Sequence, residues 1–310
     1  MFTFGSDPEF ILKKDGVMVP AVAVLPSQKN AHKYQGSCFY HDNALAEIAV
    51  KPANCEEEAV SNIMGAIGEL SRLTSPGSVH ALASGVYPDT ILDDPLCREV
   101  GCDPESCAYT MRLITDNHAA YDAIINTSHR TAGGHIHLGQ YSGPLVEDGP
   151  EPIFLVYLLD LFLGIPDVFL NKDPSQKDRR KLYGAAGRFR KKYYGVEYRT
   201  LSNYWLRNEF LIRWVYSTCE YLVENLENQN LVTVDEELWE SELYDSLGDI
   251  YKLSCVSKRA VQDAINGCDK KLARSIWKHM IENGFVPSHL SDQVESLSRL
   301  SFPEELSQSI

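Results

Sequence analysis

The segment Gly133-Gly134-His135-Ile136-His137-Leu138-Gly139 lies in a stretch, residues 132–140, that is predicted to form a strand. Its two histidines alternate with apolar residues. Because side chains alternate across a strand, His135 and His137 are expected on one face of a sheet. Flanking glycines leave room for a ligand to approach the backbone. The two imidazoles can therefore bind a metal or donate to a phosphate; two packed core histidines are the alternative.

Acidic side chains show a similar pattern on two other predicted strands. Asp7 and Glu9 are two residues apart, so they are expected on one face, where an acidic pair is costly unless a cation neutralises it. Asp42-Asn43 and Glu47 follow in an otherwise apolar stretch. Such hard oxygen ligands suit magnesium. The alternatives are a solvent-facing acidic pair beside Pro8, and a turn followed by an exposed glutamate.

Basic residues are concentrated between positions 179 and 199. They are Arg179, Arg180, Lys181, Arg188, Arg190, Lys191, Lys192 and Arg199, against one acid, Glu197. Glycines punctuate the stretch, which is typical of a loop around phosphates. Glu197 and Arg199 share a strand face and suit a metal and the phosphate that it holds; a cross-strand salt bridge is the alternative. A nucleic-acid patch is less favoured, because a net charge of -14 repels nucleic acid.

Composition places the chain among folded globular proteins. With 310 residues and 44% hydrophobic content, it can form one large domain, or one with an appendage. No secretory signal is visible, so a cytoplasmic location is expected. The apolar run Ile153 to Ile165 is shorter than the roughly 20 residues that span a bilayer, which predicts a buried helix and no membrane association.

The eight cysteines are scattered through the chain, which favours reduced thiols over a disulfide framework. The spacing of Cys97, Cys102 and Cys107 does not match a structural zinc site. Their role is left open.

Periodicity indicates an α+β domain with helices over one face of a sheet. Strands are expected at residues 2–12, 17–24, 39–50, 79–87, 132–140 and 196–202, the first two joined as a hairpin at Asp15-Gly16. Helices are expected after an N-cap at Asn54, at residues 152–162 and from Tyr204 onward, with acidic helices from Glu236 to His279. The change from strands to helices falls near residue 204.

Several segments in this order resemble the phage-type carboxylate-amine ligases of the glutamine synthetase and glutamate-cysteine ligase superfamily. They are residues 5–10 (GSDPEF), Asp42-Asn43 with Glu47, residues 101–104 (GCDP), residues 133–139 (GGHIHLG) and the stretch from Tyr183-Gly184 through Arg190 to residues 197–203 (EYRTLSN). The resemblance covers roughly residues 1–215. One departure is the aspartate at position 7, where glutamine synthetase carries a glutamate.

The resemblance implies a curved antiparallel sheet that forms an active-site funnel, with helices on its outer face, as in the catalytic domain of glutamine synthetase. This ligase domain would span residues 1–230, followed by a helical C-terminal extension, residues 231–310, packed on it. The implied metal ligands are Asp7, Glu9, Glu47, His135 and Glu197. The implied nucleotide and phosphate contacts are His137, Arg188, Arg190 and Arg199, and catalytic roles fall to Arg199, Arg190 and Asp42.

The activity implied by the resemblance is ATP-dependent amide or peptide-like bond formation. ATP, with Mg²⁺ or alternatively Mn²⁺, would activate a carboxylate as an acyl phosphate that an amine attacks. Asp42 would orient or deprotonate the amine. The partners would be small-molecule or peptide carboxylates and amines, and the oligomeric state is left open. A metal-dependent amidase, a phosphotransferase and a non-catalytic phage protein are the alternatives.

Overall fold

The computed structural model describes residues 2–99, 105–114, 127–146, 151–227 and 256–306. The strands are β1 (Phe2–Ser6), β2 (Glu9–Lys14), β3 (Val17–Val19), β4 (His32–Tyr34), β5 (Ser37–Asp42), β6 (Leu45–Ala49), β7 (Ser78–His80), β8 (Ser84–Val86), β9 (Glu105–Cys107), β10 (Arg112–Ile114), β11 (His129–Thr131), β12 (Ile136–Gln140), β13 (Arg188–Lys192), β14 (Gly195–Tyr198) and β15 (Glu305–Leu306). The predicted segment 101–104 lies outside the described residues.

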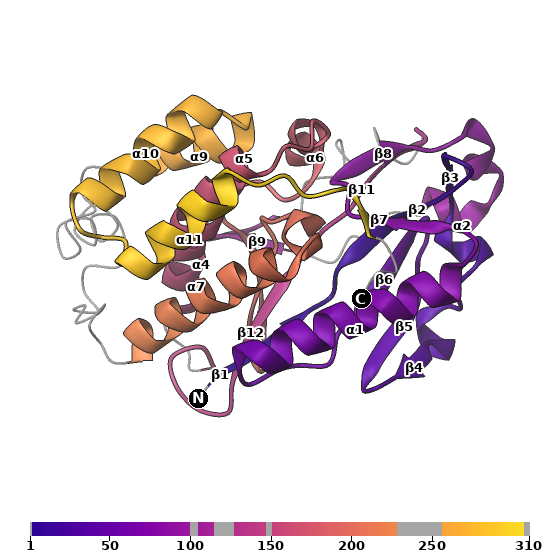
Figure 1. Cartoon of the computed structure of the whole chain (residues 1–310), viewed down its shortest axis with the longest axis horizontal. Helices are drawn as coiled ribbons and strands as arrows, with labels where there is room; N and C mark the ends of the chain where they lie inside the picture. Colours follow the sequence, from indigo (N-terminus) through magenta and orange to yellow (C-terminus); the bar gives the residue numbers. More distant parts are fainter. Residues whose placement is uncertain (1, 100–104, 115–126, 147–150, 228–255, 307–310) are drawn as a thin grey trace.

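The helices are α1 (Glu56–Thr74), α2 (Pro95–Arg98), α4 (Glu151–Leu159), α5 (Ile165–Leu170), α6 (Gln176–Leu182), α7 (Glu209–Glu227), α9 (Lys258–Gly267), α10 (Lys270–Glu282) and α11 (Ser288–Ser298). A π-helical turn, η4 (Asp160–Gly164), joins α4 to α5, and short 3₁₀ turns are η1 (Ala21–Ala23), η2 (Gln28–Asn30), η3 (Asp89–Asp93) and η5 (Asn203–Leu206). Figure 1 shows how these elements are arranged.

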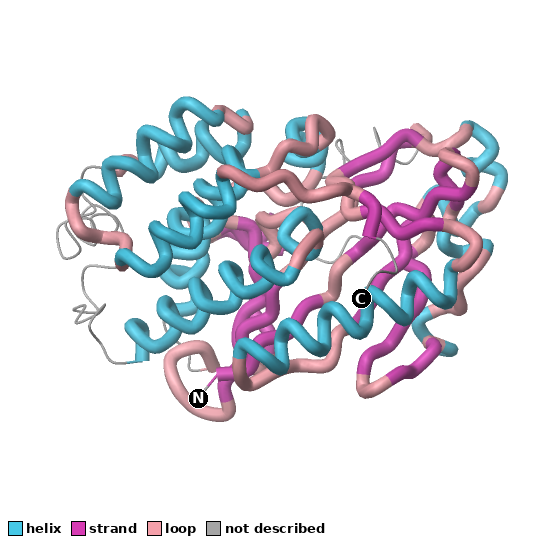
Figure 2. The backbone as a smooth tube through the Cα atoms, in the orientation of Figure 1, coloured by secondary structure: helices cyan, strands magenta, loops and turns pink. Residues whose placement is uncertain are grey.

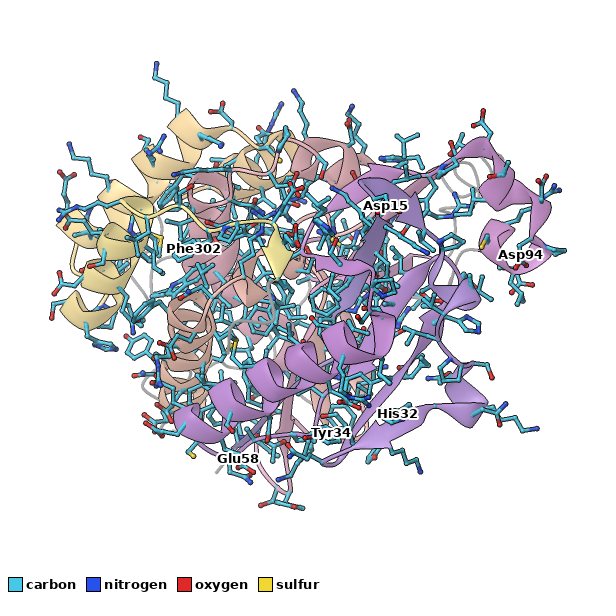
Figure 3. The ribbon with its side chains drawn as sticks, turned by 45° about the vertical axis from the view of Figure 1, so that its right-hand side comes forward. Asp15, His32, Tyr34, Glu58, Asp94 and Phe302 are labelled. Atoms are coloured by element: carbon cyan, nitrogen blue, oxygen red, sulfur yellow. The ribbon has the colours of Figure 1, made fainter. Side chains whose placement is uncertain are left out.

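Two antiparallel sheets form the framework of the molecule. One has the strand order β1-β12-β14-β13-β9-β10, and the other has the order β15-β7-β2-β6-β5-β4 with β3 also paired to β2. A two-stranded ladder, β11-β8, stands apart from both. Strand β4 is an edge strand, and its residues His32 and Tyr34 are labelled in Figure 3. The predicted combination of antiparallel strands and covering helices is confirmed.

The first predicted strand is in fact two strands in different sheets. Asp7-Pro8 interrupts it because proline has no N–H for the ladder. Strand β1 then pairs with β12, whereas β2 pairs with β3, β6 and β7. The predicted hairpin at Asp15-Gly16 is confirmed as β2–β3. Asp7 consequently lies where the two sheets meet.

Two other predicted strands are also divided. Residues 39–50 form the β5–β6 hairpin, whose turn places Asn43 at φ 56°, a left-handed conformation that asparagine tolerates. Residues 79–87 contain β7 and β8.

Helix α1 begins after Cys55, one residue later than the predicted cap, and three glutamates in its first turn suit the positive end of the helix.

The segment Glu151–Leu170, formed by α4, η4 and α5, is long and apolar enough to cross a membrane, but 94% of its most apolar window is buried inside the fold. It packs against β13, β14, α7 and α10. The predicted buried helix is therefore confirmed, and it is longer than the periodicity suggested. One continuous apolar core connects this helix to both sheets, from Phe2 to Leu306.

Figure 2 shows most helices gathered on one side of the molecule, the left in this view, and Figure 1 shows α1 crossing in front of the second sheet. Helices α9, α10 and α11 pack on α5, α6 and α7. From α11 the chain returns to the second sheet, where β15 pairs with β7. Residues 236–255 of the predicted acidic helices lie outside the described residues, and the remainder corresponds to α9 and α10.

Candidate active site

Strand register brings the predicted site residues of separate strands together. In the first sheet, β12 lies between β1 and β14, with Gly5 opposite His137 and His137 opposite Glu197. In the second sheet, Glu9 on β2 is opposite Glu47 on β6. Because Asp7 lies between the two sheets, both sets of side chains face one region.

The first ligand group consists of Asp7, His135 and Glu197, whose candidate ligand atoms all lie within 4.8 Å of one another. His135 Nδ1 is 3.1 Å from Asp7 Oδ1 and 3.8 Å from Glu197 Oε1. The other ring nitrogen of His135 is 3.0 Å from the hydroxyl of Tyr183. His135 directly precedes β12 rather than belonging to it, yet it shares Asp7 with His137, whose Nε2 is 3.0 Å away.

The protonation states of His135 and Asp7 suit cation binding. Burial, followed by the nearby Arg199, lowers the pKa of His135 to about 4, so its imidazole is neutral at pH 7. Burial acts to raise the pKa of Asp7, but contacts with His135 and His137 outweigh it and hold that pKa well below its ordinary value. A neutral imidazole and an ionised carboxylate are suitable metal ligands.

The second ligand group consists of Glu9, Asp42 and Glu47, again within 4.8 Å of one another. The backbone N–H of Gly133 donates to Glu9 Oε2 at 2.6 Å, and the Tyr40 hydroxyl donates to Glu47 Oε1 at 2.8 Å. The predicted pair of Asp7 and Glu9 is thus divided between the two groups.

These three carboxylates disfavour one another's ionisation. Burial, followed by repulsion from Asp42, raises the pKa of Glu9 to about 8. Burial and the neighbouring acids raise the pKa of Glu47 well above its ordinary value, and burial raises that of Asp42. A cation among these oxygens would remove the repulsion, so the donor set fits a divalent metal.

Three basic side chains also contact Glu197. Arg199 Nη1 is in close contact with Glu197 Oε1, Arg190 Nη1 is 3.5 Å from the same oxygen, and Lys192 Nζ is 2.8 Å from Oε2. Arg199 Nε also donates to Glu105 Oε2 at 3.1 Å. The predicted proximity of Glu197 and Arg199 is confirmed.

The sequence did not single out Lys192, Tyr183 or Glu105 as site residues. Lys192 had a usable signal, because it is two residues from Arg190 and therefore shares its strand face. Tyr183 belongs to the Tyr-Gly motif but had no assigned role. Glu105 had no local signal, since its partner Arg199 is 94 residues away in the chain.

A single phosphate-binding loop was predicted for residues 179–199. The structure instead has α6, β13 and β14 in or across this stretch. Arg179 is fully buried and donates to the carbonyls of Ala132, Arg199, Thr200 and Leu201, and the buried Arg180 pairs with Asp167 at 3.0 Å. These two arginines stabilise the fold. Arg188 pairs with Glu105 at 3.3 Å and is not among the residues that line a cavity described below.

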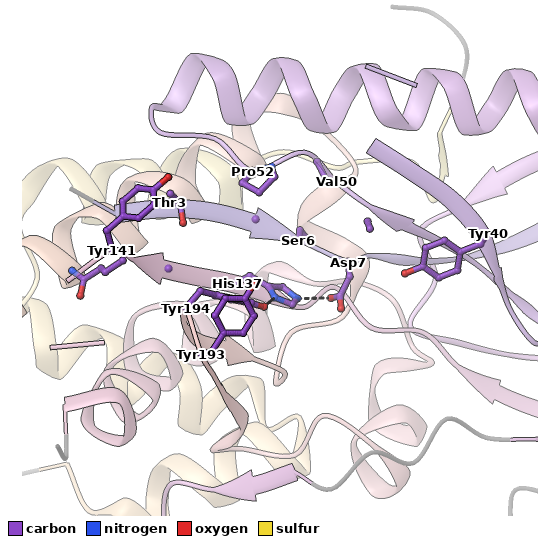
Figure 4. Close-up of a pocket in the computed structure, with 14 residues that line it drawn as sticks. Thr3, Ser6, Asp7, Tyr40, Val50, Pro52, His137, Tyr141, Tyr193 and Tyr194 are labelled. Carbon is purple, nitrogen blue, oxygen red and sulfur yellow. Dashed lines mark hydrogen bonds and ion pairs between the residues drawn. The ribbon is translucent and has the colours of Figure 1, made fainter. Parts of the chain in front are cut away.

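Two cavities adjoin at Asp7 and Tyr40, which line both. The acidic cavity, about 430 Å³, contains both ligand groups except Glu197, together with Tyr183, Arg190, Lys192 and Arg199. The tyrosine cavity, about 680 Å³, is lined by Tyr40, Tyr141, Tyr193, Tyr194, His137 and small residues of β1 and β12. Figure 4 shows His137 pointing at Asp7, with Tyr193 and Tyr194 beside it.

The sequence matches the model of a known protein family. A family model described as phage phiEco32-like COOH·NH2 ligase, type 2, matches residues 113–281, more than half of the chain. No curated protein sequence matches the chain. Among solved structures, a bifunctional glutathione synthetase from Pasteurella multocida is similar at 11% identity and a TM-score of 0.36, over 96% of this chain. This chain spans about half of that protein, 51% of its length. By the family match, the chain belongs to the phage phiEco32-like COOH·NH2 ligases of type 2.

Proposed function

We propose that this ligase uses ATP to join a carboxylate to an amine through an acyl phosphate. The observation that carries the proposal is the presence of two adjoining three-residue ligand groups beside three basic side chains. Phosphoryl transfer needs charge neutralisation and positioning more than covalent participation by the protein. The family match supports ligation as the reaction class.

The two ligand groups would hold divalent cations. Carboxylate oxygens, which both groups contain, suit Mg²⁺ and Mn²⁺. The raised pKa of Glu9 supports this assignment, because a buried carboxylate that resists ionisation next to two others lacks a counter-charge. Such a cation, when bound, neutralises phosphate charge.

The tyrosine cavity is the proposed place for the adenine ring. Tyr141 and Tyr193 are 94% and 95% exposed at its rim, and aromatic rings stack on nucleobases. His137 and Asp7 lie where this cavity adjoins the acidic cavity. A nucleotide with its base among the tyrosines would therefore extend its phosphates toward the ligand groups, which supports the predicted nucleotide contact of His137.

The acidic cavity is the proposed place of the reaction. A carboxylate oxygen of the substrate attacks the γ-phosphorus, and the bond to the bridging oxygen of ADP breaks. The amine nitrogen then attacks the acyl carbon, inorganic phosphate leaves, and the nitrogen loses a proton. Arg199, Arg190 and Lys192 would hold the moving phosphoryl group. Asp42 is the proposed acceptor of the proton, and its place beside Glu9 and Glu47 makes it a candidate cation ligand as well.

We further propose that the two sheets form the wall of a glutamine synthetase-like funnel. The support is that the ligands come from the β1–β2 junction, β5, β6, β14 and the start of β12. The ligase domain over residues 1–230, the extension over residues 231–310, small-molecule or peptide substrates, a cytoplasmic location and the absence of a nucleic-acid partner stay predictions.

A pooled screen tests the proposed function. Purified protein with ATP and Mg²⁺ is offered mixed carboxylates and amines, and mass spectrometry seeks a product equal to one of each minus water. ADP release should require both. Glu197→Gln should abolish product, whereas Glu57→Gln, the same change at an exposed position on α1, should not. Once substrates are known, ¹⁸O from the carboxylate should appear in phosphate; unlabelled phosphate alongside product would exclude the acyl phosphate.

A further inference from the structure

Asp160 is a fully buried carboxylate inside the most apolar helix of the protein. The Tyr198 hydroxyl donates to its Oδ1 at 2.7 Å, and the Tyr109 hydroxyl donates to its Oδ2 at 3.0 Å. Burial raises its pKa to about 6, while these hydroxyls act in the opposite direction. An apolar residue would cost less here, so the two acceptor oxygens call for an explanation.

The local helix geometry brings Asp160 to the sheet. Asp160 begins the π-helical turn, and such turns interrupt the regular spacing of an α-helix. Gly164 closes the turn without a side chain. A Cβ there would lie 3.2 Å from the Tyr198 hydroxyl, 3.4 Å from Asp160 Oδ1 and 2.9 Å from Ile265 Cδ1. The contact between Asp160 and Tyr198 is therefore closely packed against the helix at Gly164.

Both tyrosines belong to segments that carry the candidate site. Tyr198, the last residue of β14, is flanked by Glu197 on that strand and by Arg199 directly after it, and Glu197 lies on the opposite face of the strand from Tyr198. Tyr109 follows β9, whose Glu105 binds Arg199 Nε at 3.1 Å. One carboxylate thus holds the strand of Arg199 and the segment next to its partner Glu105.

We infer that Asp160 is a positioning residue that fixes Glu197 and Arg199 for binding of the cation and the transferred phosphoryl group. The inference rests on the proposed function. Asp160 does not line either cavity and acts through two tyrosines. Its role is to hold both tyrosine hydroxyls by hydrogen bonds, and its charge is not required. Arg179 holds the backbone carbonyls of residues 199–201 independently, so the sheet should survive loss of Asp160.

Mn²⁺ binding tests this inference without knowledge of the substrates. Free Mn²⁺ is measured by EPR during titration of the full chain, and Glu197→Gln and Glu47→Gln assign each binding class to its ligand group. Asp160→Leu, similar in size but without acceptors, should weaken the class that contains Glu197 by about tenfold to a hundredfold. The class that contains Glu47 should stay near its parental affinity.

Two further variants separate positioning from general destabilisation. Asp160→Asn can still accept from Tyr198 and can donate to the Tyr109 oxygen, so it should retain Mn²⁺ affinity. Leu158→Ala removes buried apolar volume from the same helix and should lower the Tm while leaving both classes unchanged. If Asp160→Leu does not fold, the double change Tyr109→Phe with Tyr198→Phe removes the same two hydrogen bonds and should weaken the same class.

Parental Mn²⁺ affinity in the Asp160→Leu or double tyrosine variant would overturn the inference. So would an Asp160→Asn variant as weak as Asp160→Leu, because the carboxylate charge rather than its contacts would then matter. Failure of the proposed function has a different signature: the parental protein itself would then lack the two Mn²⁺ classes.

Discussion

Glu9 shows how three contacts determine the state of one carboxylate. Its backbone places it opposite Glu47, its Oε2 accepts the N–H of Gly133, and Asp42 lies within the same ligand group. The hydrogen bond favours the ionised form, but burial and Asp42 outweigh it. Proton loss from Glu9 and cation binding should therefore be coupled.

We expect the affinity of this group for Mg²⁺ to increase with pH. Below its pKa of about 8, Glu9 holds a proton that the cation must displace, so affinity should fall about tenfold per pH unit below that value. Calorimetric titration in buffers of different ionisation enthalpy measures both the affinity and the released proton. Constant affinity with no proton release across this range would contradict the prediction.

The raised pKa of Glu9 should also make the metal-free protein less stable as pH increases. The folded state keeps the Glu9 proton up to about pH 8, whereas the unfolded chain loses it near the ordinary value of 4.5. Between these values the folded state binds more protons, so the contribution of Glu9 to stability decreases as pH rises. Added Mg²⁺ should restore that loss, because it binds only the folded site.

Arg199→Lys should separate rate from binding. Lysine keeps the charge, so much of the ATP affinity should remain, but it lacks the planar fork that can grip two phosphoryl oxygens and also bind Glu105. We expect kcat to fall by about tenfold to a hundredfold. Arg259→Lys is the matched control, because Arg259 is exposed on α9 and lines neither cavity. An unchanged kcat in Arg199→Lys would remove Arg199 from the mechanism.

At the scale of elements, side-chain alternation predicted which residues converge where one strand continues. It did not predict where a strand ends or which strands pair. The pairs His135 with His137 and Glu197 with Arg199 do converge, since each is separated by one residue near or on a regular strand. Asp7 and Glu9 do not stay together, because Asp7-Pro8 separates the end of β1 at Ser6 from the start of β2 at Glu9. The contact between Glu105 and Arg199 depends on β13 pairing with β9, which no local pattern indicates.

Gly195 makes the close approach of β14 to β12 achievable. Its φ is 145°, and a Cβ would lie 2.1 Å from the carbonyl oxygen of Leu138. We therefore expect Gly195→Ala to destabilise the fold by about 1–3 kcal/mol and to disturb Glu197, measured by denaturant unfolding and Mn²⁺ binding. Gly68→Ala on α1 is the control, because a Cβ there meets nothing within 4 Å and alanine favours a helix. Equal stability of both variants would argue against this role.

At the scale of the whole molecule, composition and periodicity were sufficient for the class of fold. They predicted strands followed by helices, and the helical region after residue 204 is confirmed for α7 and α9–α11. The antiparallel arrangement of the sheet was implied by the family resemblance instead. They could not predict that the last described residues return to the second sheet, because β15 has only two residues and its pairing depends on a partner far away in sequence. The concentration of positive charge was also visible, but burial of Arg179 and Arg180 was not.

The thiols should not contribute crosslinks. The six cysteines among the described residues, Cys38, Cys55, Cys97, Cys107, Cys219 and Cys268, are unpaired. Thermal unfolding with and without reductant should therefore give the same Tm for the full chain. A large decrease of Tm on reduction would contradict both the prediction of reduced thiols and the expected cytoplasmic location.

The pairing of β15 with β7 also determines when the second sheet can be completed during synthesis on the ribosome. Strand β7 bonds to β2 on one side early, but among the described strands its other edge is covered only by β15, which requires residues 305 and 306. A nascent chain would meanwhile expose an open edge, which is the kind of surface through which unfinished proteins associate. Synthesis of β15 would then cover this edge and reduce association of the nascent chain with other molecules.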